Sequence, residues 1–182
     1  MSPDLRAAET LPAGGFRALF EAQADYVCHS LRRLGVRPGD VEDVAHEVFL
    51  AVHRLLPLYD ASRPLKPWLF GIAFREASDY RRRAHVSREL LVEPAEEVSD
   101  EPLADAHLEA SERRALLDEA LAALDLDKRA VMLLHDLDEQ PMPTVAEALG
   151  IPLNTAYSRL RLARAELRAT LARLMARKGG RS

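Results

Sequence analysis

Apolar side chains at the start of the chain recur every three or four residues, the spacing of one helix face. This pattern predicts a first helix that begins near Phe16 and ends before Gly35, a residue that suits a helix end. Its periodic face comprises Phe16, Leu19, Phe20, Gln23, Val27, Leu31 and Leu34. A second helix is predicted over residues 40–56, with Asp40 at its N-cap. The apolar face of that helix comprises Val41, Val44, Ala45, Val48, Phe49, Val52, Leu55 and Leu56.

A proline-rich segment over residues 57–67 separates the second helix from a third and predicts a loop. The third helix is expected to begin at Pro67, because proline suits the first helical position. It carries an inward apolar stripe that starts at Trp68, and it ends in the basic run 81–83. We therefore assign Trp68 to the core.

The second half of the chain predicts a series of helices with a short turn near the end. A helix is expected over residues 111–123, and Asp127 is expected to cap the next one. A short helix around 143–149 then precedes Gly150, which permits a tight turn, and a last helix over about 154–177. This order is the helix-turn-helix pattern, which αα-hairpins share.

The last predicted helix has an apolar face and a polar, basic face, because successive residues turn by about 100°. The apolar face collects Ala156, Leu160, Ala163, Leu167, Leu171 and Leu174. The opposite face collects Asn154, Ser158, Arg161 and Ala165, flanked by Tyr157, Arg164 and Arg168 and by Thr155 and Leu162. A helix that reads DNA needs polar side chains for base edges near its start and arginines for phosphates. The pattern favours DNA binding over a solvated basic surface.

Composition and charge divide the chain into parts. The 182 residues, 48% of them hydrophobic, fit one domain or two small ones. The formal net charge is only −4, yet residues 84–111 carry −7 and residues 153–182 carry +7. The acidic stretch holds two prolines and no apolar period.

The sequence therefore predicts an all-α protein of two small helical domains. Its predicted parts are an N-terminal arm (1–15), a first domain (16–85), an acidic linker (86–110), a second domain (111–178) and a tail (179–182).

Catalytic and metal-binding patterns are missing from the sequence. Cys28 is the only cysteine, which excludes an internal disulfide and fits a reducing cytoplasm. His46 and His53 are seven residues apart, about 10 Å along a helix, which is too far to share one zinc ion. There is no nucleophile elbow, no glycine-rich phosphate loop and no apolar run long enough to span a bilayer. We expect no enzymatic activity, no cofactor, no metal, no membrane insertion and a cytoplasmic location.

Two long motifs resemble a known protein family. The first is GDVEDVAHEVFLAVHRLLPLYD followed by PWLFGIAFREASDYRRR, and the second is LDEALAALDLDKRAVMLLHDL followed by TVAEALGIPLNTAYSRLRLARAELR. In this order they resemble regions 2 and 4 of bacterial sigma factors of the extracytoplasmic-function (ECF, group IV) class of the sigma-70 family. The resemblance implies a subunit that binds core RNA polymerase, recognises the minus-10 and minus-35 promoter elements and promotes promoter melting.

The resemblance assigns roles to residues of the first domain. The second helix would bind the clamp of the largest polymerase subunit through Glu42, Asp43, His46, Glu47 and Leu50. The loop and the third helix would read and melt the minus-10 element, since basic side chains hold an exposed strand and an apolar or aromatic pocket receives an unstacked base. The residues expected there are Arg63, Lys66, Phe74, Arg75, Tyr80, Arg81, Arg82 and Arg83.

The resemblance places minus-35 recognition in the major groove, at the start of the last helix. The residues expected there are Asn154, Thr155, Tyr157, Ser158, Arg159, Arg161, Leu162 and Arg164. Leu162 stands where the family often has an arginine, and leucine suits a thymine methyl group rather than a guanine edge. Phe74-Arg75 likewise replaces the commoner Arg-Asn. We therefore do not expect the usual promoter sequences to apply.

The resemblance also implies partners: core RNA polymerase, through the largest-subunit clamp and the beta flap, promoter DNA and an anti-sigma factor. The linker would pass near the active cleft and RNA exit channel of the polymerase, and a solvated tether is an equal alternative. Two other functions remain open from the residues alone. A stand-alone helix-turn-helix transcriptional regulator would bind duplex operators unaided. A helical adaptor would bind only protein.

Overall fold

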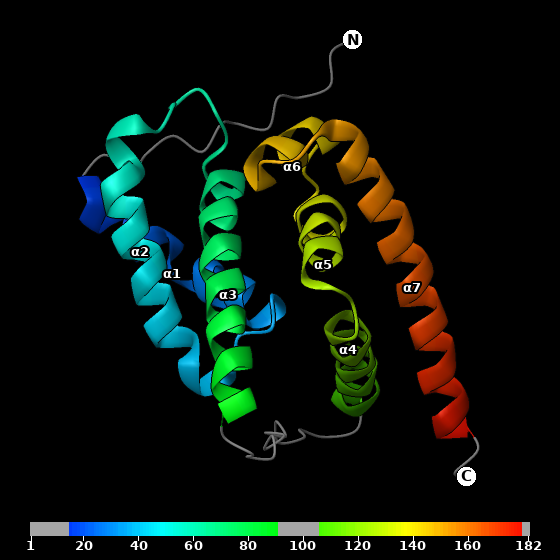
Figure 1. Ribbon diagram of the computed structural model, residues 1–182. Coiled ribbons are helices and arrows are strands. Elements are labelled where there is room, and N and C mark those ends of the chain that lie inside the picture. Colours follow the sequence, from blue (N-terminus) through cyan, green and yellow to red (C-terminus); the bar gives the residue numbers. More distant parts are fainter. Residues whose placement is uncertain (1–14, 91–105, 180–182) are drawn as a thin grey trace.

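A computed structural model describes residues 15–90 and 106–179, including side chains except those of 85–90, 106–112 and 178–179. Within these ranges the backbone is helical and contains no strand (Figure 1), which confirms the predicted all-α class. The α-helices are α1 (Gly15–Arg33), α2 (Val41–Leu55), α3 (Leu65–Leu90), α4 (Ala106–Ala122), α5 (Leu126–Met132), α6 (Met142–Leu149) and α7 (Leu153–Gly179). Three short turns complete them: η1 (Pro38–Asp40) and η2 (Leu56–Leu58), both 3-10 helical, and η3 (Leu133–Leu137), which is π-helical. None of these helices is long and apolar enough to cross a membrane.

The first helical unit consists of α1, α2 and α3, which pack against one another. Its deeply buried side chains include Leu19, Val27, Leu31, Val48, Val52, Leu69 and Ile72. Each such burial stabilises the fold by about 1.5–3 kcal/mol. After α1, Gly35 adopts φ +91°, a conformation open to glycine, and the predicted end of this helix is confirmed.

The second unit consists of α4 to α7, with α7 packed against each of the other three helices. Gly150 follows α6 with φ 65° and ψ 36°, and its N–H donates to the Glu147 carbonyl at 3.1 Å. This left-handed residue ends α6 and lets α7 begin three residues later. The predicted helix-turn-helix is confirmed at α6 and α7.

The two units are not separate in space. Buried residues of both form one continuous cluster, and α6 lies against α3 (Figure 1). The two helices approach closely at Gly71 of α3, where an added Cβ would overlap the Ala148 carbonyl oxygen and lie 3.1 Å from its carbon. Elsewhere on the boundary, Tyr26 Oη donates to Asp138 Oδ2 at 2.6 Å. The units on either side of the predicted linker therefore pack directly on each other.

Several helix limits differ from the predicted ones. Helix α3 begins at Leu65, so Pro67 lies within the first turn, where a missing N–H loses no helix bond. It continues to Leu90, and α4 begins at Ala106, so both helices enter the range predicted as linker. Most of the predicted N-terminal arm (1–14) and the centre of the linker (91–105) lie outside the described residues.

Of the two predicted N-caps, Asp40 occupies its predicted position and Asp127 does not. Asp40 precedes α2, but its side chain makes no capping bond and instead accepts a hydrogen bond from Tyr80 Oη at 2.5 Å. At α5 the cap is Asp125, whose Oδ1 accepts from the backbone N–H of Asp127 at 3.0 Å. Asp127, the predicted cap, lies in the first turn of that helix.

The Asp125 cap predicts a measurable contribution to stability. Asp125→Ala should lower the free energy of unfolding by about 1 kcal/mol, because it leaves the N–H of Asp127 without its acceptor. Urea denaturation followed by circular dichroism measures the change. Asp118→Ala, an exposed acidic residue of α4, is the control and should stay within about 0.5 kcal/mol of wild type. Equal losses in the two variants would contradict the capping role.

Candidate nucleic-acid interface

The start of α7 presents an exposed polar surface, as its periodicity predicts. Ala156, Leu160 and Ala163 are buried against the second unit. The residues expected to contact DNA that are exposed are Asn154, Tyr157, Ser158, Arg161, Leu162 and Arg164. An open groove of about 500 Å³ runs beside Tyr157, Arg161 and Arg164. Thr155 is half-buried, so it lies at the edge of this surface rather than on it.

Arg164 is held in place by an acidic side chain from outside its helix. Its Nε and Nη2 donate to Asp136 Oδ2 and Oδ1 at 3.0 and 2.5 Å, a two-bond fork that fixes the guanidinium plane. The Asp136 hydrogen bond raises the pKa of Arg164 further above its ordinary value. Asp136 belongs to the π-helical turn η3. This partner could not be predicted from the sequence, because the two residues are 28 positions apart.

Arg159 takes a different position from the other arginines of α7. It is half-buried, and its Nη2 donates to Asp127 Oδ2 of α5 at 2.5 Å. A neighbouring pair, Lys128 Nζ to Glu166 Oε1 at 2.7 Å, joins the same two helices. Arg159 therefore braces α7 against α5. The sequence predicts a DNA contact for Arg159 and does not predict this pair.

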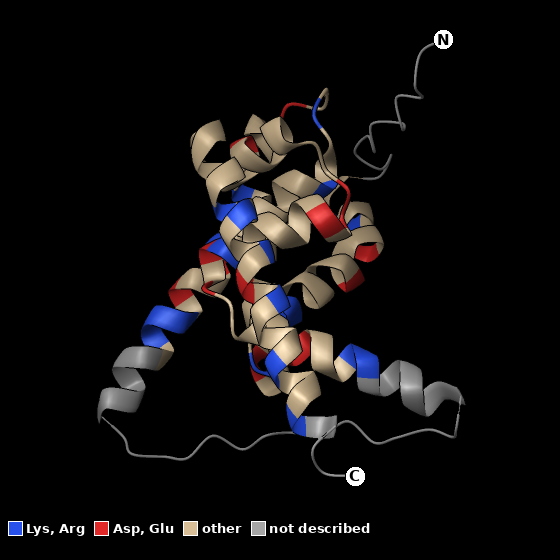
Figure 2. Ribbon diagram, turned by 90° about the vertical axis from the view of Figure 1, so that its right-hand side faces the viewer, with Lys and Arg blue, Asp and Glu red and all other residues tan. Residues whose placement is uncertain are grey.

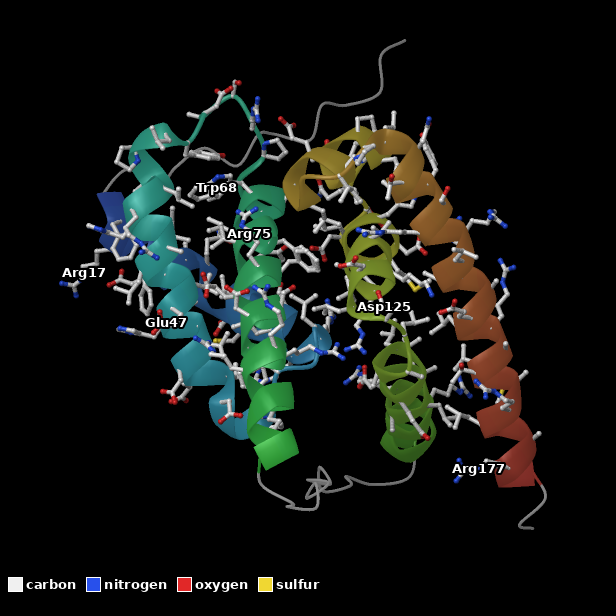
Figure 3. All side chains as sticks on the ribbon, viewed as in Figure 1. Arg17, Glu47, Trp68, Arg75, Asp125 and Arg177 are labelled. Carbon is white, nitrogen blue, oxygen red and sulfur yellow. The ribbon has the colours of Figure 1, made fainter. Side chains whose placement is uncertain are left out.

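A second basic surface lies at the loop before α3 and on that helix. Arg63 and Arg75 are exposed and line a cavity of about 130 Å³ with Trp68. Figure 3 shows Trp68 and Arg75 near the start of α3. The ring of Trp68 stacks at a tilt on Tyr59, with ring centroids 4.6 Å apart. Trp68, predicted to lie in the core, is half-buried and forms part of this cavity.

The loop itself is held in one shape by local hydrogen bonds. Asp60 Oδ1 accepts from the N–H and hydroxyl of Ser62 at 2.9 and 2.7 Å, and these bonds lower the pKa of Asp60. Tyr59 Oη donates to the Arg63 carbonyl at 2.5 Å. The backbone that carries Arg63 is therefore positioned before any ligand binds.

The other residues expected at this surface are spread along α3 and its surroundings. Lys66 is half-buried with its Nζ 5.8 Å from the centre of the Tyr26 ring, and Phe74 packs against the core. Tyr80 donates to Asp40, and burial followed by this bond raises the pKa of Tyr80. The exposed run Arg81, Arg82 and Arg83 lies further along α3. The structure thus brings Arg63 and Arg75 together with Trp68, and it does not bring Phe74 or Tyr80 into that group.

An acidic surface covers the outer side of α2. Its members, all exposed, are Glu42, Asp43, His46, Glu47 and Leu50. Phe20, on the periodic face of α1 that lies beside α2, is 44% exposed. Its ring meets Phe49 of α2 at 4.6 Å between centroids. Glu47 lies on the outer side of α2 in Figure 3, away from the second unit.

Within the described residues no group of three or more histidine, cysteine or acidic side chains is placed to hold a metal ion. His46 is exposed, and His53 meets the edge of the Phe16 ring at 5.0 Å between centroids. In Figure 2 the basic and acidic residues lie interspersed over the helices. The described surfaces can therefore bind a partner through charge, hydrogen bonds and apolar contacts.

Comparison with known proteins gives two family matches. Residues 19–86 match the model of Sigma-70 region 2, and residues 114–167 match that of Sigma-70, region 4. The RNA polymerase sigma factor NccH of Alcaligenes xylosoxydans xylosoxydans is 31% identical over 86% of this chain and 86% of its own. The ECF RNA polymerase sigma factor SigL of Mycobacterium tuberculosis is 31% identical over 87% of this chain and 89% of its own.

Two solved structures are similar to the chain in fold. CnrH in complex with the cytosolic domain of CnrY has a TM-score of 0.59 and 26% identity, covering 88% of this chain and 91% of that one. The sigma factor RpoE in complex with the anti-sigma factor NepR from Bartonella quintana has a TM-score of 0.69 and 21% identity. That match covers 86% of this chain and 96% of the other.

The different positions of two α7 arginines predict different effects on folding. Arg159→Ala should lower the free energy of unfolding by about 1 kcal/mol, because Asp127 loses a half-buried partner. Arg161→Ala should stay within about 0.5 kcal/mol of wild type, since Arg161 is exposed. Urea denaturation of both variants tests the distinction. An unchanged Arg159→Ala variant would show that the pair with Asp127 does not brace α7.

Proposed function

The chain belongs to the sigma-70 family and is an RNA polymerase sigma factor of the ECF class, and on that premise we propose which of its surfaces carries each step of initiation. The observation that carries the proposal is the exposure of three chemically distinct surfaces. These are the start of α7, the Arg63–Arg75 cavity and the acidic side of α2. We propose domain limits of 16–85 for region 2 and 111–178 for region 4, with the linker between them.

The start of α7 reads the minus-35 element in the major groove. Arg161 and Ser158 face outward beside the groove, which suits contact with base edges. Tyr157 and Leu162 are exposed apolar side chains on this surface, at 54% and 40%, and they suit thymine methyl groups. Arg164 contacts a phosphate, and Arg159 acts by holding α7 at the correct angle.

The loop before α3 captures the melted strand of the minus-10 element. Its preformed backbone supports this role. A loop that is already ordered loses no conformational entropy when an unstacked base binds to it. Arg63 and Arg75 hold phosphates, and the cavity beside Trp68 accepts part of a base. Arg81, Arg82 and Arg83 follow the strand along α3. Phe74 and Tyr80 stabilise the fold and do not contact DNA, since both side chains have partners within the protein.

The acidic side of α2 binds the clamp of the largest polymerase subunit, and region 4 contacts the beta flap. An exposed leucine amid four polar or acidic side chains is typical of an interface with a small apolar centre and a charged rim. The protein acts in the cytoplasm, at the nucleoid when bound to polymerase, and has no catalytic activity of its own. CnrH and RpoE were solved with CnrY and with the anti-sigma factor NepR, which supports an anti-sigma partner here.

Run-off transcription with purified bacterial core polymerase on a pool of genomic promoters tests the whole assignment. We expect discrete transcripts that depend on this protein, with start sites that reveal both promoter elements. A duplex mobility shift without polymerase, and no transcript, would instead favour a stand-alone regulator. Association with polymerase without any transcript from the pool would contradict the promoter-reading roles.

Arg161→Ala should weaken selection of the minus-35 element by about 1–3 kcal/mol, because a base contact is lost. Competition between promoters with intact and scrambled minus-35 elements measures the change. Affinity for core polymerase should be unchanged. The control is Arg177→Ala, an exposed arginine at the far end of α7, which should select promoters like wild type. Loss of core binding in Arg161→Ala would show that α7 is misassigned.

Leu50→Ala should weaken binding to core polymerase by about tenfold, because a central apolar contact of about 1–2 kcal/mol is removed. Folding stability should not change, since the side chain is 47% exposed. Fluorescence anisotropy of labelled protein titrated with core polymerase gives the affinity. Leu58→Ala, an 82% exposed leucine in η2, is the control and should bind normally. Equal weakening by both substitutions would place the interface elsewhere.

A further inference from the structure

We propose that this sigma factor selects an A·T-rich minus-35 element with one required G·C pair, and that Arg161 is the side chain that reads its guanine. The proposal rests on the function proposed above for the start of α7, and it names the class of DNA sequence that this surface prefers. It follows from which polar side chains of α7 already have partners within the protein and which have none.

The three arginines near the start of α7 differ in what binds them. Arg159 is half-buried and donates to Asp127, so its guanidinium is held toward α5. Arg164 donates to Asp136 through Nε and Nη2, which are the two donors of one guanidinium edge. Arg161 is exposed, and within the described part of the chain its side chain has no hydrogen bond or ion pair. Of the three, only Arg161 has every donor free for the O6 and N7 acceptors of a guanine.

The position of each arginine along the helix axis decides which part of the DNA it reaches. Residues 154–162, the reading segment, span about 12 Å of axis, close to the width of the major groove of about 12 Å. Arg161 lies within this segment. Arg164 and Arg168 lie further along the axis, by about 5 and 10 Å from Arg161, toward the phosphates that border the groove. The free edge of Arg164 and the whole of Arg168 therefore bind phosphates, which carry no sequence information.

The other exposed side chains of the reading segment favour A·T pairs. Asn154 is exposed at the second position of α7, and its amide suits adenine N6 and N7. Leu162 offers only apolar contact, which suits a thymine methyl group, and the ring of Tyr157 offers the same contact. Ser158 bonds to any base pair and adds no preference.

The helix period places the two apolar side chains on opposite sides of Arg161. At about 100° per residue, Asn154, Ser158 and Arg161 follow one line along the exposed face, with Tyr157 on one side and Leu162 on the other. Contacts that favour thymine therefore border the guanine on both sides. A second guanine would need another unpaired arginine, and the described reading segment contains none.

Selection from a randomised promoter library measures the preference directly. Each member carries one minus-10 element, taken from a promoter found by run-off transcription, and a random minus-35 segment. Full-length protein bound to core polymerase transcribes the members it recognises, and sequencing of these gives the base frequencies at each position. We expect one position that requires guanine, with adenine and thymine predominant at the positions around it.

Substitutions in the reading segment should change this profile in opposite directions. Arg161→Ala should reduce the preference for guanine by about tenfold or more, because its bidentate contact is lost. Leu162→Arg should add a second required guanine, because a free guanidinium then reaches a base edge. Leu162→Met keeps an apolar side chain of similar size and is the control, with the wild-type profile. Two or more required guanines in wild type would overturn the proposal, and so would an unchanged profile in Leu162→Arg.

Arg164→Ala tests whether a second arginine reads a base. We expect it to weaken binding to all library members alike and to reduce the salt dependence of binding by about one phosphate contact, with an unchanged base profile. A guanine preference that disappears in Arg164→Ala would show that this arginine reads a base, and would overturn the assignment of the required guanine to Arg161 alone.

The same selection distinguishes failure of this proposal from failure of the proposed function of α7. If a preferred minus-35 sequence emerges and changes in Arg161→Ala, but is rich in G·C pairs, only the proposed sequence class is wrong. If transcription depends on the protein while the random segment shows no preference, α7 does not read the minus-35 element. In that case the proposed function of this surface is wrong as well.

Discussion

The backbone contact between α3 and α6 at Gly71 is the constraint on which the arrangement of the two units depends. Helices that meet through side chains usually lie 8–10 Å apart, and only a residue without Cβ allows backbone to meet backbone. This approach brings Glu147 within reach of Arg63 and closes one side of the Trp68 cavity. The surface proposed to bind the minus-10 strand and the contact between the two units therefore both depend on one small residue.

Arg129 joins the two units at another part of their boundary, through the Arg33 carbonyl of α1. Burial, followed by the nearby charge of Arg81, lowers the pKa of Arg129 to about 10, so it remains charged at neutral pH. The Ala122 and Leu124 carbonyls that accept its bonds lie at and just beyond the end of α4, where carbonyls lack helical partners. The charge is thus satisfied mainly within the second unit. A Cβ on Gly35 would lie 2.7 Å from its Nη1, so α1 ends on a glycine that leaves room for the guanidinium.

Sequence periodicity predicted the faces of α2 and α7 well, because the helix period alone decides which side chains share a face. It did not predict the partners of polar residues, because those partners are distant in sequence. Asp40 was a good N-cap by position, yet Tyr80 reaches it from 40 residues away. Arg159 lies among the residues predicted to contact DNA, yet its side chain donates a hydrogen bond to Asp127. Gly71 carried no visible signal, since its role depends on a helix from the other half of the chain.

Four acidic side chains of the second unit form bonds that shape its surface and its contact with the first unit. Asp127 and Asp136 pair with arginines of α7, whereas Asp138 and Glu147 bond to the first unit. Two acids thus shape the start of α7, the surface proposed to read DNA, and two hold the units together. Any phosphate that binds Arg164 must compete with Asp136, and this cost is the same for every DNA sequence. Such competition weakens nonspecific and specific binding alike, so contacts to base edges are left to decide which promoter is chosen.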